Sequence, residues 1–319
     1  MANLAVMLRI ERRHGLSNDE RSTIGNLIDT VTACSGHRPI PDQLWLDLHD
    51  HEDDEAEFAL IFEDHNGETL IGYAQASPAH GSWTMGAVVE PGRADRARLL
   101  GDLARTVVEM IGGRGGGTVH WWVLGDDALT DQVALDIGLH EVRSLLQMRI
   151  ALPVEPGAPL VLRPFRTGHD EDAWLAVNNS AFSWHAEQGG WDLEMLQRRE
   201  RESWFDPAGF LLHERDARLA GFCWTKIHHD TQPVLGEIYV IAVHPDFHGL
   251  GLGRALTSAG LTHLADRGVR IGMLYVDGTN AAAIGLYTSM GFVVHRTDRA
   301  HFGSVPGTPP STELMIAGR

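Results

Sequence analysis

Cysteine, long apolar runs and basic residues are all scarce in this chain, and each scarcity disfavours a class of protein. The two cysteines among 319 residues, Cys34 and Cys223, suggest neither a disulfide framework nor a metal cluster. No apolar run approaches the ~18 residues of a membrane span, and the N-terminus lacks the apolar region of a signal peptide. With 26 Lys and Arg against 43 Asp and Glu, the formal net charge is −17, which argues against a nucleic-acid partner. We therefore expect a cytoplasmic monomer with no metal, no membrane and no nucleic acid.

The sequence contains one internal repeat. Three short matches recur at offsets of 154, 153 and 149 residues: 87–91 with 241–245, 136–139 with 289–292, and 71–73 with 220–222. A proline-rich stretch without periodicity, residues 152–159, separates the copies and is typical of a linker. We predict an N-terminal domain over 1–151, a linker over 152–159 and a C-terminal domain over 160–319.

Both copies predict the same α/β order. In the first copy, Ser17 and Glu20 form a capping box that opens a helix toward Ala33, and Asn66-Gly67 indicates a hairpin between two strands. In each copy antiparallel strands come first, and strands alternating with helices follow. This order predicts a mixed sheet with flanking helices, present as two tandem domains.

The strongest chemical motif lies between a strand and a helix of the second copy. Residues 248–253 read His-Gly-Leu-Gly-Leu-Gly, with glycines at every second position. Such a loop lets backbone N–H groups converge, and the helix N-terminus adds partial positive charge, so the two together suit a pyrophosphate. A glycine-rich turn without any ligand is an equally good interpretation of the loop alone. A dinucleotide-binding fold fits less well because antiparallel strands precede the loop, and no Gly-Lys-Ser/Thr follows for a P-loop.

With this motif the C-terminal copy resembles the GNAT acetyltransferase superfamily. That family has Gln/Arg-x-x-Gly-x-Gly/Ala after its fourth strand, and here His248 takes the first position. An Asn that opens the next helix and a Tyr before a Gly-Phe pair match Asn280, Tyr287 and Gly291-Phe292. The resemblance implies acetyl-CoA as cosubstrate. The residues that it implies for acetyl-CoA binding are Ile241, Ala242, Val243, His248, Gly249, Leu250, Gly251, Leu252, Gly253, Arg254, Asn280, Ala281, Ala282, Ala283, Ile284 and Gly285.

A closer resemblance, to the mycothiol synthases, covers almost the whole chain. It rests on segments 185–191, 204–207, 224–226, 236–240 and 274–276, of which Glu-Gln-Gly-Gly-Trp at 187–191 is the most specific. Those tandem GNAT enzymes acetylate the cysteine amine of cysteinyl-glucosaminyl-inositol. The resemblance implies substrate contacts at Asp42, where the family pattern has Glu, and at Glu187, Lys226, Glu237 and Tyr275. A GNAT enzyme for another amine, or a non-catalytic acyl-CoA sensor, remains an alternative.

Two residues are candidates for proton transfer. Glu237, at the start of the strand before the glycine loop, could take the amine proton directly or through water, although from sequence alone an ordinary surface carboxylate is the simpler interpretation. Tyr287 lies two helical turns after Asn280, and the resemblance implies that it protonates the leaving thiolate. Its alternative role is core packing on Phe292. The His228-His229 pair is expected to be solvated.

The first copy differs at the position of the glycine loop. After Pro91 it reads Gly-Arg-Ala-Asp-Arg-Ala-Arg-Leu over 92–99, so the spaced glycines are absent. Side chains there would obstruct backbone approach to a pyrophosphate. We therefore expect the N-terminal copy to have a degenerate cofactor loop and to serve as a structural or substrate-lining domain.

Overall fold

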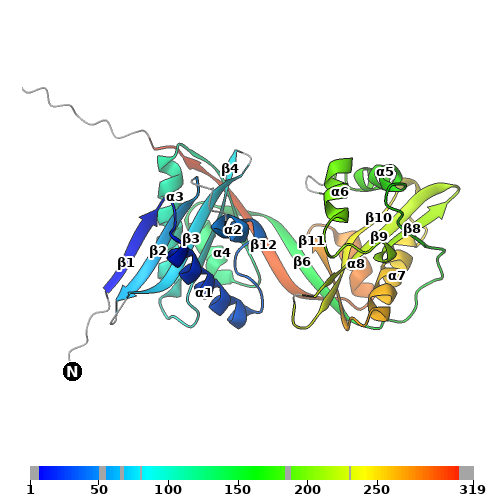
Figure 1. Ribbon diagram of the computed structural model, residues 1–319, viewed down its shortest axis with the longest axis horizontal. Helices are drawn as coiled ribbons and strands as arrows, with labels where there is room; N and C mark the ends of the chain where they lie inside the picture. The colour runs from blue at the N-terminus through cyan, green and yellow to red at the C-terminus, as the bar shows by residue number, and fades with distance from the viewer. Residues whose placement is uncertain are drawn as a thin grey trace, which may run out of the picture. The chain divides into compact units, whose positions relative to one another are not determined.

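The computed structural model describes residues 7–49, 55–64, 68–79, 81–183, 188–229 and 231–308. These residues form two compact units. Unit 1 contains the described residues up to Leu145 together with those from Thr297 onward, and unit 2 runs from Leu146 to Arg296. The chain is coloured along its length in Figure 1. No helix within these ranges is long and apolar enough to cross a membrane.

Unit 1 is a mixed sheet with helices on both faces. Its strands lie in the order β1-β2-β3-β4-β5-β12, where β12 spans Val293–Pro306. β4 and β5 pair in parallel, and the other neighbouring strands of this order pair antiparallel. The elements are β1 (Met7–Arg13), α1 (Asn18–Ser35), α2 (Asp42–His49), β2 (Glu57–Asp64), β3 (Glu68–Ala79), β4 (Ser82–Val89), α3 (Arg96–Gly113), β5 (Gly116–Val123), α4 (Ala128–Asp136) and the first part of β6 (His140–Ala151). The predicted capping box is confirmed, since Ser17 accepts from the Glu20 backbone and Glu20 accepts from the Ser17 N–H at 2.8 Å. The predicted Asn66-Gly67 turn lies outside the described residues.

Unit 2 repeats this architecture. Its strands follow the order β6-β11-β10-β9-β8-β7, with β10 and β11 parallel. The elements are β7 (Arg163–Pro164), α5 (Glu171–Ala181), α6 (Leu193–Glu200), η1 (Pro207–Gly209), β8 (Phe210–Arg215), β9 (Arg218–His228), β10 (Leu235–Val243), η2 (Pro245–Phe247), α7 (Leu252–Asp266), β11 (Ile271–Asp277), α8 (Ala281–Ser289) and the first four residues of β12, up to Arg296. The strand predicted at 160–163 is reduced to the two residues of β7.

The last strands of the two copies depart from the predicted domain boundaries. Residues 299–306 of β12 pair antiparallel with β5 of the first copy, and β6, the last strand of the first copy, lies next to β11 of the second. The compact units therefore divide at Leu145/Leu146 and Arg296/Thr297, rather than at the linker 152–159. A periodic pattern identifies a strand but not its neighbour in the sheet. The sequence therefore does not show that β12 pairs with β5 of the first copy or that β6 lies next to β11 of the second.

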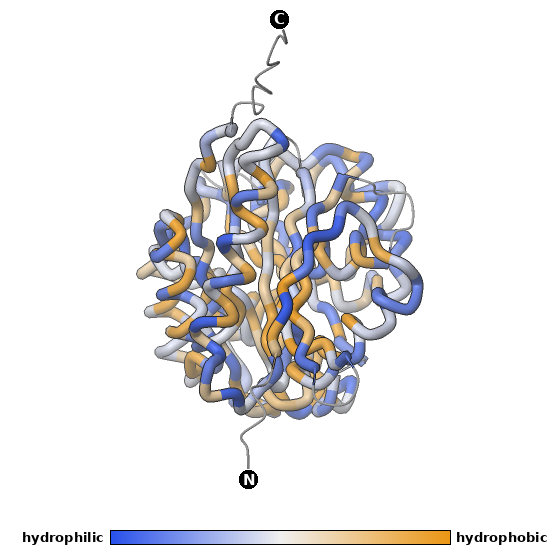
Figure 2. Tube along the Cα trace, turned by 90° about the vertical axis from the view of Figure 1, so that its left-hand side faces the viewer, coloured by the Kyte–Doolittle hydropathy of each residue, from blue (hydrophilic) through white to orange (hydrophobic). Residues whose placement is uncertain are grey.

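Each unit has a hydrophobic core on both faces of its sheet. In unit 1, α3 covers one core around Leu103, and α1 and α2 cover the other around Ile28 and Leu44. In unit 2, α7 covers the core around Leu256, and α5 and α6 cover the core around Trp174. Figure 2 shows hydrophilic and hydrophobic residues alternating along the helical turns, as expected for helices that bury one face.

Candidate active site

The site in unit 2 begins where two parallel strands separate. β10 and β11 pair at three positions only, from Leu235 opposite Ile271 to Glu237 opposite Met273. Beyond Glu237, β10 continues to Val243 and pairs with β9 on its other side. The β11-facing edge of residues 238–243 is therefore outside the ladder, and its polar backbone groups are available to a ligand. Ile241, Ala242 and Val243, which were predicted to bind the cofactor, lie on this open part of the edge.

The glycine loop lies at the end of this opening. Gly249 and Gly251 have φ values of +78° and +76°, in the left-handed region that side chains disfavour. Gly251 is the N-cap of α7, a helix of 15 residues. Because glycine has no side chain, it cannot accept a hydrogen bond from the first backbone N–H groups of that helix. Gly253 differs, because an added Cβ there would meet Leu286 at an ordinary 3.5 Å. The loop is thus shaped as an anion site by its first two glycines.

A cleft of about 760 Å³ joins the loop to the open edge of β10. Most of the residues predicted for the cofactor line it: Ile241, Ala242, Val243, His248, Gly249, Gly251, Leu252, Gly253, Asn280, Ala282 and Ala283. The predicted residues Leu250, Arg254, Ala281, Ile284 and Gly285 are not among the lining residues. The sequence analysis missed Ala181, Phe182, Phe247, Thr279 and Leu286, which also line the cleft and carry no motif of their own.

Two predicted cleft residues make structural hydrogen bonds. The Asn280 side chain caps α8 by accepting from the Ala283 N–H at 3.1 Å. The His248 ring contacts the Val243 carbonyl through Nε2 at 3.0 Å, which ties the loop back to the end of β10. Both contacts hold the walls of the cleft in place.

A β-bulge shapes the neighbouring face of the sheet. Ile238 is opposite Thr225 and Val240 is opposite Trp224, so Tyr239 is an extra residue on β10. Tyr239 packs against Trp204, with ring centroids 5.0 Å apart. The Lys226 ammonium lies 4.6 Å from the Trp204 ring centroid and 5.6 Å from that of Tyr239. Lys226, a predicted substrate contact, is thus held by cation–π contacts.

Glu237 is buried and has a partner that the sequence analysis missed. Glu237 is 8% exposed, and its carboxylate Oε2 lies 2.7 Å from Nε2 of His228. The prediction that the His228-His229 pair is solvated is therefore wrong for His228, whereas His229 is exposed. His228 and Lys226 lie two residues apart and so share one face of β9, and the pairing of Lys226 with Glu237 brings the carboxylate to that face.

Tyr275 is held on β11 by two polar side chains of the same unit. Its hydroxyl accepts from the Gln147 amide at 2.7 Å and from Nη2 of Arg296 at 3.2 Å. The Tyr275 residue remains 37% exposed. A fixed hydroxyl on a partly open ring suits contact with a polar substrate.

Tyr287, on α8, packs in the hydrophobic core of unit 2. It is 8% exposed, and its ring packs against Phe292 at a centroid distance of 5.7 Å. The core packing weighed as an alternative is therefore present. Burial raises the pKa of its phenol to about 12, so the hydroxyl keeps its proton at neutral pH. A role as proton donor remains a prediction.

The two remaining predicted substrate residues are Asp42 and Glu187. Asp42 begins α2 in unit 1, where its largely exposed carboxylate accepts from Arg38 at 2.8 Å. Glu187 lies outside the described residues. Within the described ranges, no group of three or more His, Cys, Asp and Glu side chains could hold a metal ion.

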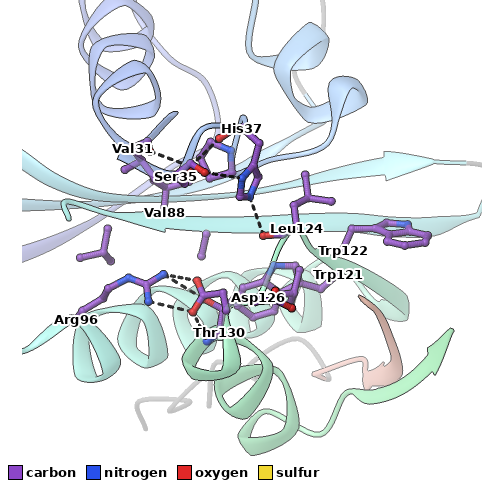
Figure 3. Close-up of a pocket in the computed structure, with 15 residues that line it drawn as sticks. Val31, Ser35, His37, Val88, Arg96, Trp121, Trp122, Leu124, Asp126 and Thr130 are labelled. Atoms are coloured by element: carbon purple, nitrogen blue, oxygen red, sulfur yellow. Dashed lines mark hydrogen bonds and ion pairs between the residues drawn. The ribbon is translucent and has the colours of Figure 1, made fainter. Parts of the chain in front are cut away.

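Unit 1 has a cleft at the corresponding place, and it is smaller. β4 and β5 pair only from Ser82 with Thr118 to Met85 with Trp121, so these strands also separate. The cleft measures about 290 Å³. At its edge His37 contacts the Leu124 carbonyl at 3.0 Å, as Figure 3 shows.

An ion pair occupies the helix N-terminus in this smaller cleft. Arg96, the first residue of α3, binds both carboxylate oxygens of Asp127, with Nη1 to Oδ1 at 3.0 Å. Asp127 is the N-cap of α4, the position that Asn280 has in unit 2. Burial raises the pKa of Asp127, but hydrogen bonds from Arg96 and Thr130 outweigh it and lower the pKa below its usual value. The carboxylate is therefore ionised, and it neutralises the arginine that an incoming phosphate would need.

Comparison with known proteins agrees with this architecture. Residues 178–292 match the model of the Acetyltransferase (GNAT) family. The chain is 40% identical over 282 residues to mycothiol acetyltransferase from Acidimicrobium ferrooxidans, covering 85% of this chain and 90% of that protein. It is 41% identical over 293 residues to mycothiol acetyltransferase from Thermobispora bispora, covering 89% and 96%.

Solved structures share the fold over nearly the full length. A GCN5-related N-acetyltransferase from Sphaerobacter thermophilus superposes with a TM-score of 0.70 at 22% identity, covering 94% of this chain and 97% of that chain. A tandem GNAT protein from the clavulanic acid pathway gives 0.62 at 16% identity, covering 95% and 100%. The predicted tandem GNAT fold is thereby confirmed, and the chain belongs to the mycothiol acetyltransferase family of GNAT enzymes.

Proposed function

We propose that unit 2 transfers the acetyl group of acetyl-CoA to the cysteine amine of cysteinyl-glucosaminyl-inositol. One observation carries this proposal: Glu237 is the last residue of β10 that pairs with β11, so its carboxylate lies where the strands open. A base at this point is next to the open strand edge along which a thioester would lie. The names of the relatives support the choice of substrate.

The geometry of unit 2 fits the cosubstrate. The uncapped N-terminus of α7 and the left-handed glycines would hold the pyrophosphate, and the open edge of β10 would bind the pantetheine arm by backbone hydrogen bonds. An N–H group of Ile241, Ala242 or Val243 would donate to the thioester oxygen as charge develops on it. Because the chain carries a net charge of −17, these local donors must supply the attraction for an anion.

The proton transfers are assigned to two residues. Glu237 would take the proton from the substrate ammonium, directly or through water, leaving the neutral amine to attack. Tyr287 would donate its hydroxyl proton to the departing thiolate, a role that suits a phenol kept protonated by burial. Lys226 and Tyr275, together with the predicted contacts Asp42 and Glu187, would bind the polar groups of the substrate.

Unit 1 is proposed to have no catalytic role. Its cleft is smaller than that of unit 2, and the Arg96–Asp127 pair occupies the helix N-terminus that would bind a phosphate. We therefore expect one acetyl-CoA per chain, measured by calorimetry of the full-length protein. A stoichiometry of two would contradict this assignment. We also propose a cytoplasmic monomer that needs no metal, which light scattering and assays with a chelator would test.

The substrate is tested by mass spectrometry of thiols from cells that lack the protein. Unacetylated cysteinyl-glucosaminyl-inositol should accumulate, and mycothiol should disappear. The purified enzyme should acetylate that thiol in preference to other amines. Unchanged mycothiol in such cells would point to a GNAT enzyme for another amine.

A further inference from the structure

The cross-strand geometry around Glu237 brings in a residue that the proposed mechanism does not yet use. Glu237 is directly opposite Lys226, and His228 is opposite Leu235, so Glu237 and His228 are diagonal neighbours on one face. The Nε2–Oε2 distance of 2.7 Å is that of a strong hydrogen bond involving a charged group. This pairing comes from the register of β9 and β10, which also places Glu237 at the point where the strands separate.

We propose that His228 is a positioning residue for Glu237, a role that rests on the proposed function of Glu237 as the base. With Glu237 ionised, Nε2–H of His228 donates to Oε2 and fixes the carboxylate, leaving Oε1 to take the substrate proton. A glutamate side chain has three rotatable bonds, so a carboxylate without such a partner would sample several orientations. A base oriented by a third group is a recurring arrangement in enzymes that activate a nucleophile.

The other groups around the carboxylate do not duplicate this role. Lys226, directly opposite on β9, has its ammonium over the rings of Trp204 and Tyr239. The Tyr239 phenol is hydrogen-bonded to Arg199, and burial raises its pKa. The His228 side chain is 20% exposed and that of Glu237 is 10% exposed, so the pair is largely shielded from water. A hydrogen bond in such a place is weakened little by solvent.

The test compares His228→Leu with His228→Gln, and uses His229→Leu as the matched control because His229 is adjacent and exposed. Losing a hydrogen bond to a charged group should lower kcat by about 10- to 100-fold in His228→Leu. Gln keeps an N–H donor and should recover most of that loss. The Kd for acetyl-CoA should stay unchanged in all three.

A double-mutant cycle separates positioning from a general structural effect. If His228 acts through Glu237, His228→Leu should have no further effect in the Glu237→Gln background. Equal kcat in His228→Leu and His229→Leu, or the same loss from His228→Leu in both backgrounds, would overturn the proposal. A Glu237→Gln variant with near-normal kcat would instead refute the proposed base. If the Leu variant does not fold, His228→Asn, whose shorter amide cannot reach Oε2, takes its place and is subject to the same outcomes.

Discussion

The two clefts of this chain share an opening between parallel strands but differ in what occupies the helix N-terminus beside it. In unit 2 that terminus is capped by Gly251 without a side-chain bond, and in unit 1 it begins with Arg96, which is paired with Asp127. If unit 1 binds no acetyl-CoA, as we propose, strand separation alone does not make a cofactor site. The backbone donors at the helix N-terminus must also be accessible, and no internal anion may compete for the nearby cations.

The largest expected contrast between the clefts concerns the base. Glu237→Gln should lower kcat by roughly 10²–10⁴, the range for losing a general base. Changes in the first turn of α3 in unit 1, such as Arg98→Ala, should cost far less, because that cleft is expected to do no chemistry. Steady-state kinetics with saturating acetyl-CoA would measure both. Similar losses in the two variants would mean that the active unit is misassigned.

The proton donor should give the next largest effect. Tyr287→Phe keeps the ring on Phe292 and removes only the hydroxyl, so kcat should fall by about 10²–10³ with little change in acetyl-CoA affinity. Since burial raises the pKa of Tyr287 to about 12, its deprotonation should not reduce kcat until the pH approaches that value. Pre-steady-state kinetics would measure the chemical step. A Phe variant with close to normal kcat would leave Tyr287 as a core residue only.

The glycine loop offers a matched pair of substitutions. Gly251 and Gly92 have φ values of +76° and +78°, so Val is equally strained at both. Gly251→Val should weaken acetyl-CoA binding at least about tenfold by disturbing the α7 N-terminus, a loss of 1.4 kcal/mol or more. Gly92→Val should leave affinity unchanged. Calorimetry that found the same affinity in both variants would remove the pyrophosphate assignment.

The smallest expected effects come from exchanging the two helix caps. Asn280→Asp keeps the cap of α8 but adds a negative charge to the cleft, and should weaken acetyl-CoA binding at least about fivefold. The reverse change, Asp127→Asn in unit 1, should leave affinity unchanged and lower the free energy of unfolding by about 1 kcal/mol through the lost ion pair. Calorimetry and urea denaturation measure these quantities. Tighter acetyl-CoA binding in Asp127→Asn, or a second acetyl-CoA site, would show that the Asp127 carboxylate alone keeps acetyl-CoA out of the unit 1 cleft.

Local sequence pattern alone determined much of the fold. The capping box at Ser17 predicted α1, and the alternating glycines between a strand and a helix predicted the loop before α7. The repeat predicted two related units, and the missing glycines after Pro91 predicted that the first unit lacks the glycine loop. These features depend on residues close together in the chain, where periodicity and backbone preference act directly.

Tertiary structure alone decided which distant residues meet. The pairing of β12 with β5, the contact of His228 with Glu237 and the ion pair of Arg96 with Asp127 each join residues between 9 and 190 positions apart. A shift of one residue in strand register would turn a side chain to the other face of the sheet, so composition and motifs cannot predict such contacts. In unit 2 the register from Leu235 to Ile238, before the bulge at Tyr239, places His228 beside the proposed base.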